Sequence, residues 1–152
     1  MTRSNRQLTQ FAIKAIQDVL LQGPEPSTTT AGNTEITVDC CTCGRPPNII
    51  VRLFGKEILR VYTSPLNHRK VVGVKLATGE FHDNKGRPSR TTRERQNGIL
   101  DALGANGILP HTRVFIRDNE GCYVGDGSNC RPFDVNSQSV AILSHPTDLM
   151  FA

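Results

Sequence analysis

The sequence predicts an α+β domain, in which an antiparallel sheet of about five to seven short strands carries an N-terminal amphipathic helix and a second helix near residues 91–103. Apolar residues recur with a helical period at two places in the 152-residue chain, whereas short β-branched runs separated by turn residues fill most of the remainder. Hydrophobic residues make up 37% of the chain, aromatic residues 5%, and tryptophan is absent. We therefore expect a core of mainly aliphatic side chains.

The first helix is expected within residues 1–22, and Gly23-Pro24 ends it. Its apolar positions are spaced by three and four residues along one face. They are Leu8, Phe11, Ala12, Ala15, Ile16, Val19 and Leu20. We expect this stripe to pack on the domain's own sheet, and the alternative is a self-association surface that would make a homo-oligomer.

Residues 23–34 are small, polar and interrupted by proline, which predicts a flexible linker before a single α+β domain over residues 35–152. Alternating and β-branched runs predict the strands of that domain. They are expected at 35–39, 48–54, 57–63, 71–77, 112–117 and 122–125, with 132–135 and 139–143 as candidates for further short strands. Gly55-Lys56 separates the second and third of these runs, and glycine at the first position of a two-residue loop predicts a type II′ hairpin.

The second helix has recognisable start and stop signals. Thr91 and Glu94 have the spacing of a capping box, so Thr91 is the expected N-cap. The buried side of the helix is expected to consist of Ile99, Leu100 and Leu103. Gly104 is placed for the C-cap. This helix therefore follows directly after the most basic part of the chain.

The net charge of +4 is concentrated in one segment. Residues 67–95 hold eight basic residues against three acidic ones, a net charge of +5 over 29 residues, whereas the rest of the chain holds ten basic and eleven acidic residues. A concentrated basic patch attracts polyanions, while a diffuse charge of this size affects only solubility. A solvated basic face without a ligand is the alternative interpretation.

Four arginines crowd the start of the second helix, where the helix dipole disfavours cations. We expect this arrangement where an anion binds, because guanidinium groups, hydroxyl groups and first-turn amides together hold a phosphate. The residues expected to do so are Arg87, Ser89, Arg90, Thr91, Thr92, Arg93 and Arg95, together with the basic pair Arg69 and Lys70. The alternative is that these arginines pair with Asp83, Glu94 or more distant acids.

These residues predict a non-enzymatic protein that binds nucleic acid, DNA or RNA, through its phosphates. Tyr62 and Phe81 are the nearest aromatic residues. We expect both in the core, which favours backbone contact over readout of bases. The main alternative is a protein-interaction module, such as an enzyme inhibitor, whose arginines bind an acidic protein surface.

Enzyme signatures are absent from the sequence, since it has no Walker loop, dinucleotide fingerprint, nucleophile elbow or His-Glu-x-x-His helix. Glu80, His82 and Asp83 form the only close grouping of acids with a histidine, which keeps an Mg²⁺-dependent nuclease as the third interpretation. No apolar stretch reaches the roughly 20 residues that a membrane span needs, and no signal peptide is expected. We therefore expect a cytoplasmic protein with no membrane partner.

The five cysteines are an odd number, so complete pairing in disulfides would leave one thiol over. Cys40 and Cys43 have the two-residue spacing of half a zinc site, which Cys122 and Cys130 would complete if the fold brought the two segments together. Reduced thiols of an intracellular protein are the favoured interpretation, with zinc second and a disulfide third. Zinc is the one cofactor that the sequence suggests.

The stretch from Val71 to Gly104 includes Gly79-Glu-Phe-His-Asp-Asn and Pro88-Ser-Arg-Thr-Thr-Arg-Glu-Arg-Gln-Asn-Gly-Ile-Leu-Asp-Ala-Leu. Over roughly residues 60–125 the chain resembles small uncharacterised proteins that are encoded by tailed phages and archaeal viruses. The resemblance implies a viral protein inside a host cell, and it assigns no role to any residue. Any protein partner or inhibited enzyme would then belong to the host.

Overall fold

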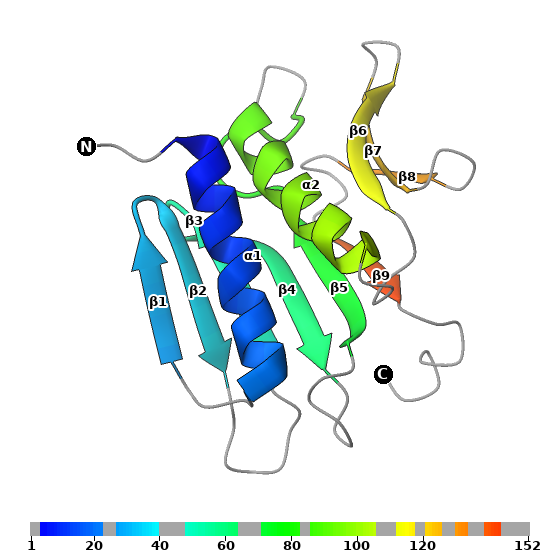
Figure 1. The fold of residues 1–152 in the computed structure, drawn as a ribbon. Helices are drawn as coiled ribbons and strands as arrows, with labels where there is room; N and C mark the ends of the chain where they lie inside the picture. The colour runs from blue at the N-terminus through cyan, green and yellow to red at the C-terminus, as the bar shows by residue number, and fades with distance from the viewer. Residues whose placement is uncertain are drawn as a thin grey trace.

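The computed structural model describes residues 4–22, 27–39, 48–63, 71–82, 86–105, 112–117, 121–125, 130–133 and 139–143. Within these residues the chain forms two helices and two antiparallel sheets (Figure 1). The larger sheet has six strands in the order β1-β2-β3-β4-β5-β9, and the smaller has three in the order β6-β7-β8. The predicted α+β class is confirmed, although the sequence did not indicate that the strands divide between two sheets.

Most of the strands of the larger sheet precede the second helix in the chain, and the smaller sheet follows it. In chain order the elements are α1 (Asn5–Gln22), β1 (Ser27–Ala31), β2 (Thr34–Asp39), β3 (Asn48–Leu53), β4 (Lys56–Thr63), β5 (Val71–Ala77), α2 (Arg90–Ala105), β6 (Arg113–Arg117), β7 (Gly121–Gly125), β8 (Cys130–Pro132) and β9 (Ser139–Leu143). Within the described part of the chain, neither helix combines the length and apolar composition that crossing a bilayer requires.

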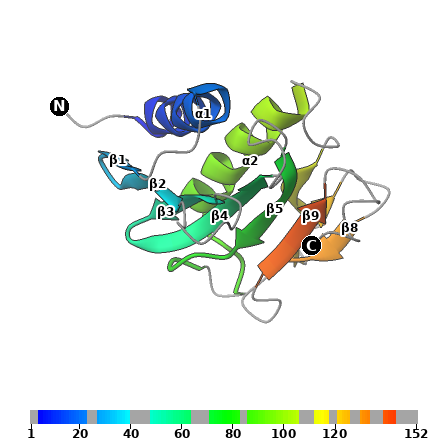
Figure 2. The same cartoon turned by 90° about the horizontal axis from the view of Figure 1, so that it is seen from below.

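Both helices lie on the same face of the six-stranded sheet (Figure 2). Four residues of α1, spaced one turn apart, are at most 6% exposed, namely Leu8, Ala12, Ile16 and Leu20. The predicted packing of this stripe on the chain's own core is confirmed. The stripe is consequently not available for the alternative, a homo-oligomer formed through the N-terminal helix.

Part of the predicted flexible linker is a strand. Ser27–Ala31 pairs antiparallel with β2 at the edge of the sheet, and Thr34 already belongs to β2. The linker prediction is therefore wrong from Ser27 onward, while residues 23–26 lie outside the described residues. Consecutive threonines are polar in composition but β-branched in shape, and they suit a solvent-facing edge strand.

The turn between β3 and β4 is made by Phe54 and Gly55, one residue earlier than predicted. Both residues have positive φ, 53° and 81°, which is the pattern of a type I′ turn and not of the predicted type II′ turn. Type I′ turns favour asparagine or glycine at the first position, so phenylalanine is an unusual occupant.

Helix α2 is fixed to both sheets by amide side chains. Gln96 Nε2 donates to the carbonyl oxygens of Ile58 and Ala77, each at 2.9 Å. Asn97 exchanges two hydrogen bonds with the backbone of Val114 in β6, at 2.8 and 2.7 Å, much as a neighbouring strand would. These bonds set the position and direction of α2, and hence of the basic segment that precedes it.

The two helices approach each other closely at Gly98. A Cβ atom at this position would lie 2.2 Å from Cγ2 of Thr9 in α1, far inside the contact distance of two non-bonded carbon atoms. The absence of a side chain at Gly98 therefore allows the first half of α1 to pack directly on α2.

Candidate nucleic-acid interface

Helix α2 begins at Arg90, and Ser89 is its N-cap. The Ser89 Oγ atom accepts a hydrogen bond from the Thr92 amide at 3.2 Å and lies 3.0 Å from Thr92 Oγ1. The predicted N-cap, Thr91, instead lies inside the first turn, so that prediction is wrong. Since the side chain of Thr92 is only 1% exposed, the hydroxyls of Ser89 and Thr92 serve the helix start and not a ligand at the surface.

Arg95 is completely buried, which contradicts its predicted role as a phosphate contact. Its Nη1 atom donates to the Asn5 carbonyl oxygen at 2.8 Å and to Thr9 Oγ1 at 2.9 Å. Its Nη2 atom donates to Asn33 Oδ1 at 3.2 Å and, at 3.4 Å, to Asn5 Oδ1. Arg95 therefore joins α2 to the first turn of α1 and to the turn between β1 and β2.

Burial also changes the electrostatics of Arg95. Loss of solvent lowers the pKa of its guanidinium, and the negative charge of neighbouring Glu94 opposes that shift. The helical period of α2 already carried a signal for burial, because Arg95 precedes Ile99 by four residues and so shares its face. The charge of the segment gave no such signal.

Three other arginines remain at the start of α2, and we call Arg87, Arg90 and Arg93 the arginine surface. The side chain of Arg90 is 86% exposed, while Arg87 and Arg93 are half-buried. Arg90 Nε donates to Glu94 Oε1 at 2.9 Å, and Arg93 Nε donates to the Pro88 carbonyl oxygen at 3.2 Å. Among the described residues, these bonds leave the Nη donors of Arg90 and Arg93 for a further acceptor.

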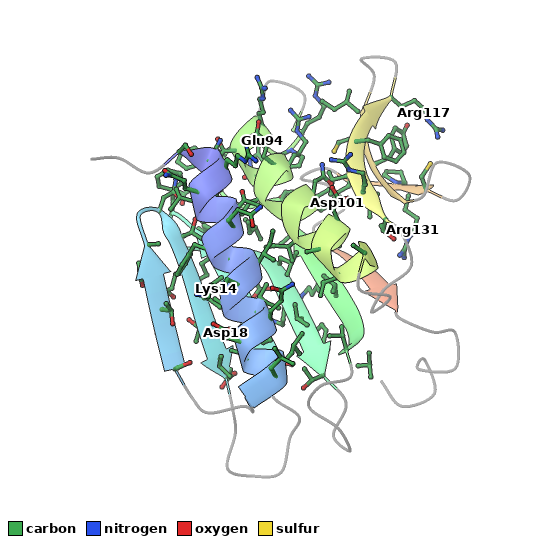
Figure 3. The ribbon with its side chains drawn as sticks, in the orientation of Figure 1. Lys14, Asp18, Glu94, Asp101, Arg117 and Arg131 are labelled. Atoms are coloured by element: carbon green, nitrogen blue, oxygen red, sulfur yellow. The ribbon has the colours of Figure 1, made fainter. Side chains whose placement is uncertain are left out.

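Glu94 lies among these cations and forms an ion pair with Arg90. It lies between the first turns of the two helices (Figure 3), where it accepts from Arg90 and from Asn5 Nδ2, the latter at 2.9 Å. Two exposed cations that the sequence did not single out lie on neighbouring segments, Arg6 after Asn5 and Lys56 after the β3–β4 turn. Positive charge at this end of the molecule therefore extends beyond α2.

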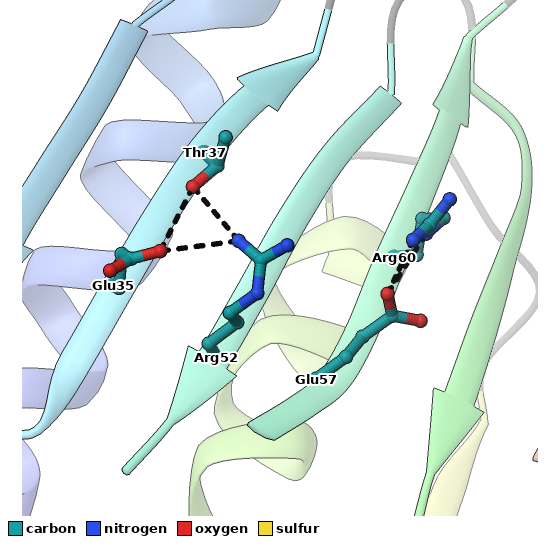
Figure 4. A network of polar contacts seen from close by, with 5 residues as sticks. All are labelled: Glu35, Thr37, Arg52, Glu57 and Arg60. Atoms are coloured by element: carbon teal, nitrogen blue, oxygen red, sulfur yellow. Dashed lines mark hydrogen bonds and ion pairs between the residues drawn. The ribbon is translucent and has the colours of Figure 1, made fainter. Parts of the chain in front are cut away.

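The helix-free face of the large sheet differs from the arginine surface because its arginines are paired with carboxylates (Figure 4). Arg52 Nη1 lies 3.1 Å from Glu35 Oε1 and 3.0 Å from Thr37 Oγ1. Arg60 pairs with Glu57; burial lowers the pKa of Arg60, but the hydrogen bond and charge of Glu57 outweigh this and raise it. That face is neutralised within the chain and offers less attraction to a polyanion.

The second predicted basic pair, Arg69 and Lys70, lies outside the described residues, as does Asp83. The structure therefore leaves Arg87, Arg90, Arg93 and the partly exposed Thr91 at the start of α2, and it withdraws Arg95 and Thr92 from the surface.

Phe81 is 49% exposed, so its predicted place in the core is wrong. It lies next to Phe54 of the β3–β4 turn, which is 52% exposed. The sequence interpretation missed Phe54 because it placed this residue inside a strand. Tyr62 is half-buried in β4.

The predicted zinc ligands do not converge in the described residues. Cys130 is opposite Gly125 in the β7–β8 pair, whereas Cys122 lies three residues further along β7, about 10 Å away, with its side chain on the other face. In this register the two thiols cannot bind one ion, and neither is in a disulfide. Cys40 and Cys43 lie outside the described residues.

A catalytic metal centre is not evident in the described ranges either, since no three His, Cys, Asp or Glu side chains there are grouped as metal ligands. His82 Nε2 lies 3.3 Å from Thr78 Oγ1, and Glu80 is exposed. The described residues thus add no observation that favours the nuclease interpretation.

Comparisons with protein-family models, with curated proteins and with solved structures found no match to this chain. The function is consequently argued from the chain's own residues.

Proposed function

We propose that this protein binds nucleic acid without catalysis, and that the arginine surface contacts the phosphates. The observation that carries the proposal is the gathering of three arginines at one helix start, where the Arg90 side chain is 86% exposed and Arg87 and Arg93 are partly exposed. Like charges gathered at one helix start repel one another, and a phosphate backbone relieves that repulsion.

We assign these contacts to the arginine side chains, because two of the amides at the helix start already have acceptors. The Thr92 amide is already bound by Ser89, and the Arg93 amide donates to the Ser89 carbonyl oxygen at 3.0 Å. A guanidinium presents a planar set of donors that matches two phosphate oxygens. In this proposal each of the three arginines contacts one phosphate, and Arg69 and Lys70 extend the contact along the strand.

The proposed setting is viral and intracellular. The local resemblance to phage and archaeal-virus proteins supports the first part, and the second part follows from the sequence-based expectation of reduced thiols. A viral protein in the host cytoplasm meets both viral and host nucleic acid.

Binding of fluorescent oligonucleotides, followed by anisotropy at about 50 mM salt, tests the proposal. A triple variant removes the arginine surface, and a matched variant removes three cations elsewhere, so that both have the same net charge. The first is Arg87→Ala/Arg90→Ala/Arg93→Ala, and the second is Lys14→Ala/Lys75→Ala/Arg131→Ala.

We expect the arginine variant to lose most of its affinity and the matched variant to stay within about threefold of the unmodified protein. Equal losses in the two variants would mean that net charge alone drives binding. Absence of any binding by the unmodified protein would refute the proposal and favour an acidic protein as the partner.

A further inference from the structure

Phe54 and Phe81 form an exposed pair of aromatic rings, which we call the aromatic pair. Their ring centroids are 5.1 Å apart and the ring planes are inclined by 83°, an edge-to-face arrangement. Both rings are about half exposed, whereas most large apolar side chains of the described residues are buried. Neither ring is needed to fill the core.

The backbone of Phe54 is strained for a residue of this size. Its φ of 53° lies in the left-handed region, where a bulky side chain is disfavoured and glycine or asparagine is typical. Strained residues persist where the surrounding structure or a function requires them. Since the Phe54 ring is half exposed, burial does not explain why phenylalanine occupies this position.

The aromatic pair adjoins the arginine surface. The Phe81 carbonyl oxygen accepts a hydrogen bond from the amide of Ser89, the N-cap of α2, at 2.9 Å. An antiparallel bridge between His82 and Pro88 continues this contact. Arg90 follows Ser89 directly, so the exposed ring of Phe81 and the exposed side chain of Arg90 belong to segments whose backbones are hydrogen-bonded neighbours.

We infer that the aromatic pair stacks on bases of a single-stranded nucleic acid whose phosphates contact the arginine surface. This inference rests on the proposed function and specifies its ligand. Sites for single strands combine cationic side chains along the backbone with aromatic rings on which bases stack. The bases of a duplex already stack on one another, so their faces are not available to Phe54 or Phe81.

The second aromatic pair of the molecule provides a contrast. Phe115 and Tyr123 are stacked with their centroids 6.2 Å apart. The guanidinium of Arg117 lies over both rings, 5.7 Å and 5.4 Å from their centroids. This cation covers the rings from within the chain, whereas the described residues place no cation over Phe54 or Phe81.

The test compares two probes that carry the same phosphates, a 12-nucleotide oligothymidylate and a 12-unit abasic oligomer. Affinities are measured by anisotropy for the unmodified protein, for Phe54→Leu/Phe81→Leu, and for the matched control Phe115→Leu/Tyr123→Leu. Leucine keeps an apolar side chain but removes the aromatic face. Thermal unfolding of each variant checks that it is folded.

We expect the unmodified protein to bind oligothymidylate about 5- to 150-fold more tightly than the abasic oligomer, the range for one stacked base. Phe54→Leu/Phe81→Leu should abolish this difference and leave affinity for the abasic oligomer unchanged. The control pair should retain the difference. Phe54→Leu/Phe81→Leu should leave the affinity for a duplex of equal length unchanged, because the bases of a duplex do not stack on the aromatic pair.

Equal, salt-sensitive binding of both probes by the unmodified protein would overturn the inference and leave the proposed function standing. Absence of binding to either probe would overturn the proposed function itself. A further readout uses Phe81→Trp, because the unmodified chain has no tryptophan and the introduced one is the sole source of tryptophan fluorescence. Oligothymidylate should quench its fluorescence through stacking, and the abasic oligomer should not; equal quenching by both would contradict stacking.

Discussion

Replacing Arg95 by alanine is expected to destabilise the fold and not to weaken a ligand contact. The side chain is fully buried, and its guanidinium donates four hydrogen bonds, three of them to α1 and one to Asn33. Alanine removes two buried methylene groups, about 1.6 kcal/mol in transfer free energy. Acceptors on Asn5 and Asn33 that lose their donor add about 1–3 kcal/mol.

With a contribution from the cavity, the free energy of unfolding should fall by about 3–5 kcal/mol. Arg95→Met should cost about 1–2 kcal/mol, because methionine refills much of the volume and removes the desolvated charge. Arg93→Ala is the matched control; its side chain is half-buried with one hydrogen bond to Pro88, and we expect a change within about 0.5 kcal/mol.

The measurement is equilibrium unfolding in urea followed by far-ultraviolet circular dichroism, with the free energy obtained by linear extrapolation. Nucleic-acid affinity is then measured under conditions where each variant is folded. An Arg95→Ala protein as stable as the unmodified one, but with reduced affinity for nucleic acid, would refute the burial of Arg95 and restore it to the binding surface.

Three further predictions concern the contacts of α2. Gly98→Ala should lower the unfolding free energy by about 1–3 kcal/mol through its clash with Thr9, and Thr9→Ser should restore much of it in a double-mutant cycle, because serine lacks the clashing methyl group. Asn97→Ala should speed hydrogen exchange in β6 and β7, since Val114 loses both of its side-chain hydrogen bonds; unchanged exchange there would contradict this. Glu94→Gln should raise nucleic-acid affinity severalfold by removing the negative charge beside the arginine surface, whereas weaker binding would argue against phosphate contact.

Residues with a clear period could be assigned from the sequence. The apolar stripe of α1 is periodic over four turns. A stripe of this kind on one face of a helix packs against the core, so its burial could be predicted. Strands β3 to β5 are short runs rich in β-branched residues, and they were located to within one residue. Helix α2 was found for the same reason as α1.

The edge strand β1 could not be assigned because its composition is that of a loop. Ser27 and the three threonines after it are all exposed, so no apolar alternation marks the strand. Its hydrogen bonds come from β2, which is a tertiary contact and not a local propensity. The position of the β3–β4 turn was wrong by one residue, since Phe54 adopts a backbone conformation that its residue type disfavours.

The candidate site was found as a segment but not as a surface. Counting charges located the start of α2, yet it treated Arg95 like its neighbours, although the period of the helix places Arg95 on the buried face. The contribution of Phe54 depends on a hairpin turn that is distant in the sequence from Phe81. Such a pairing appears only when the sheet is assembled.

The dependence of affinity on salt tests the central claim most directly. We expect the logarithm of the association constant for a single-stranded oligonucleotide to fall linearly with the logarithm of salt concentration. Removal of Arg87, Arg90 and Arg93 should reduce that slope by about 2, or about 0.7 for each lost phosphate contact. The variant that lacks Lys14, Lys75 and Arg131 is the control. If both triple variants had the salt slope of the unmodified protein, phosphate binding by the arginine surface would be contradicted.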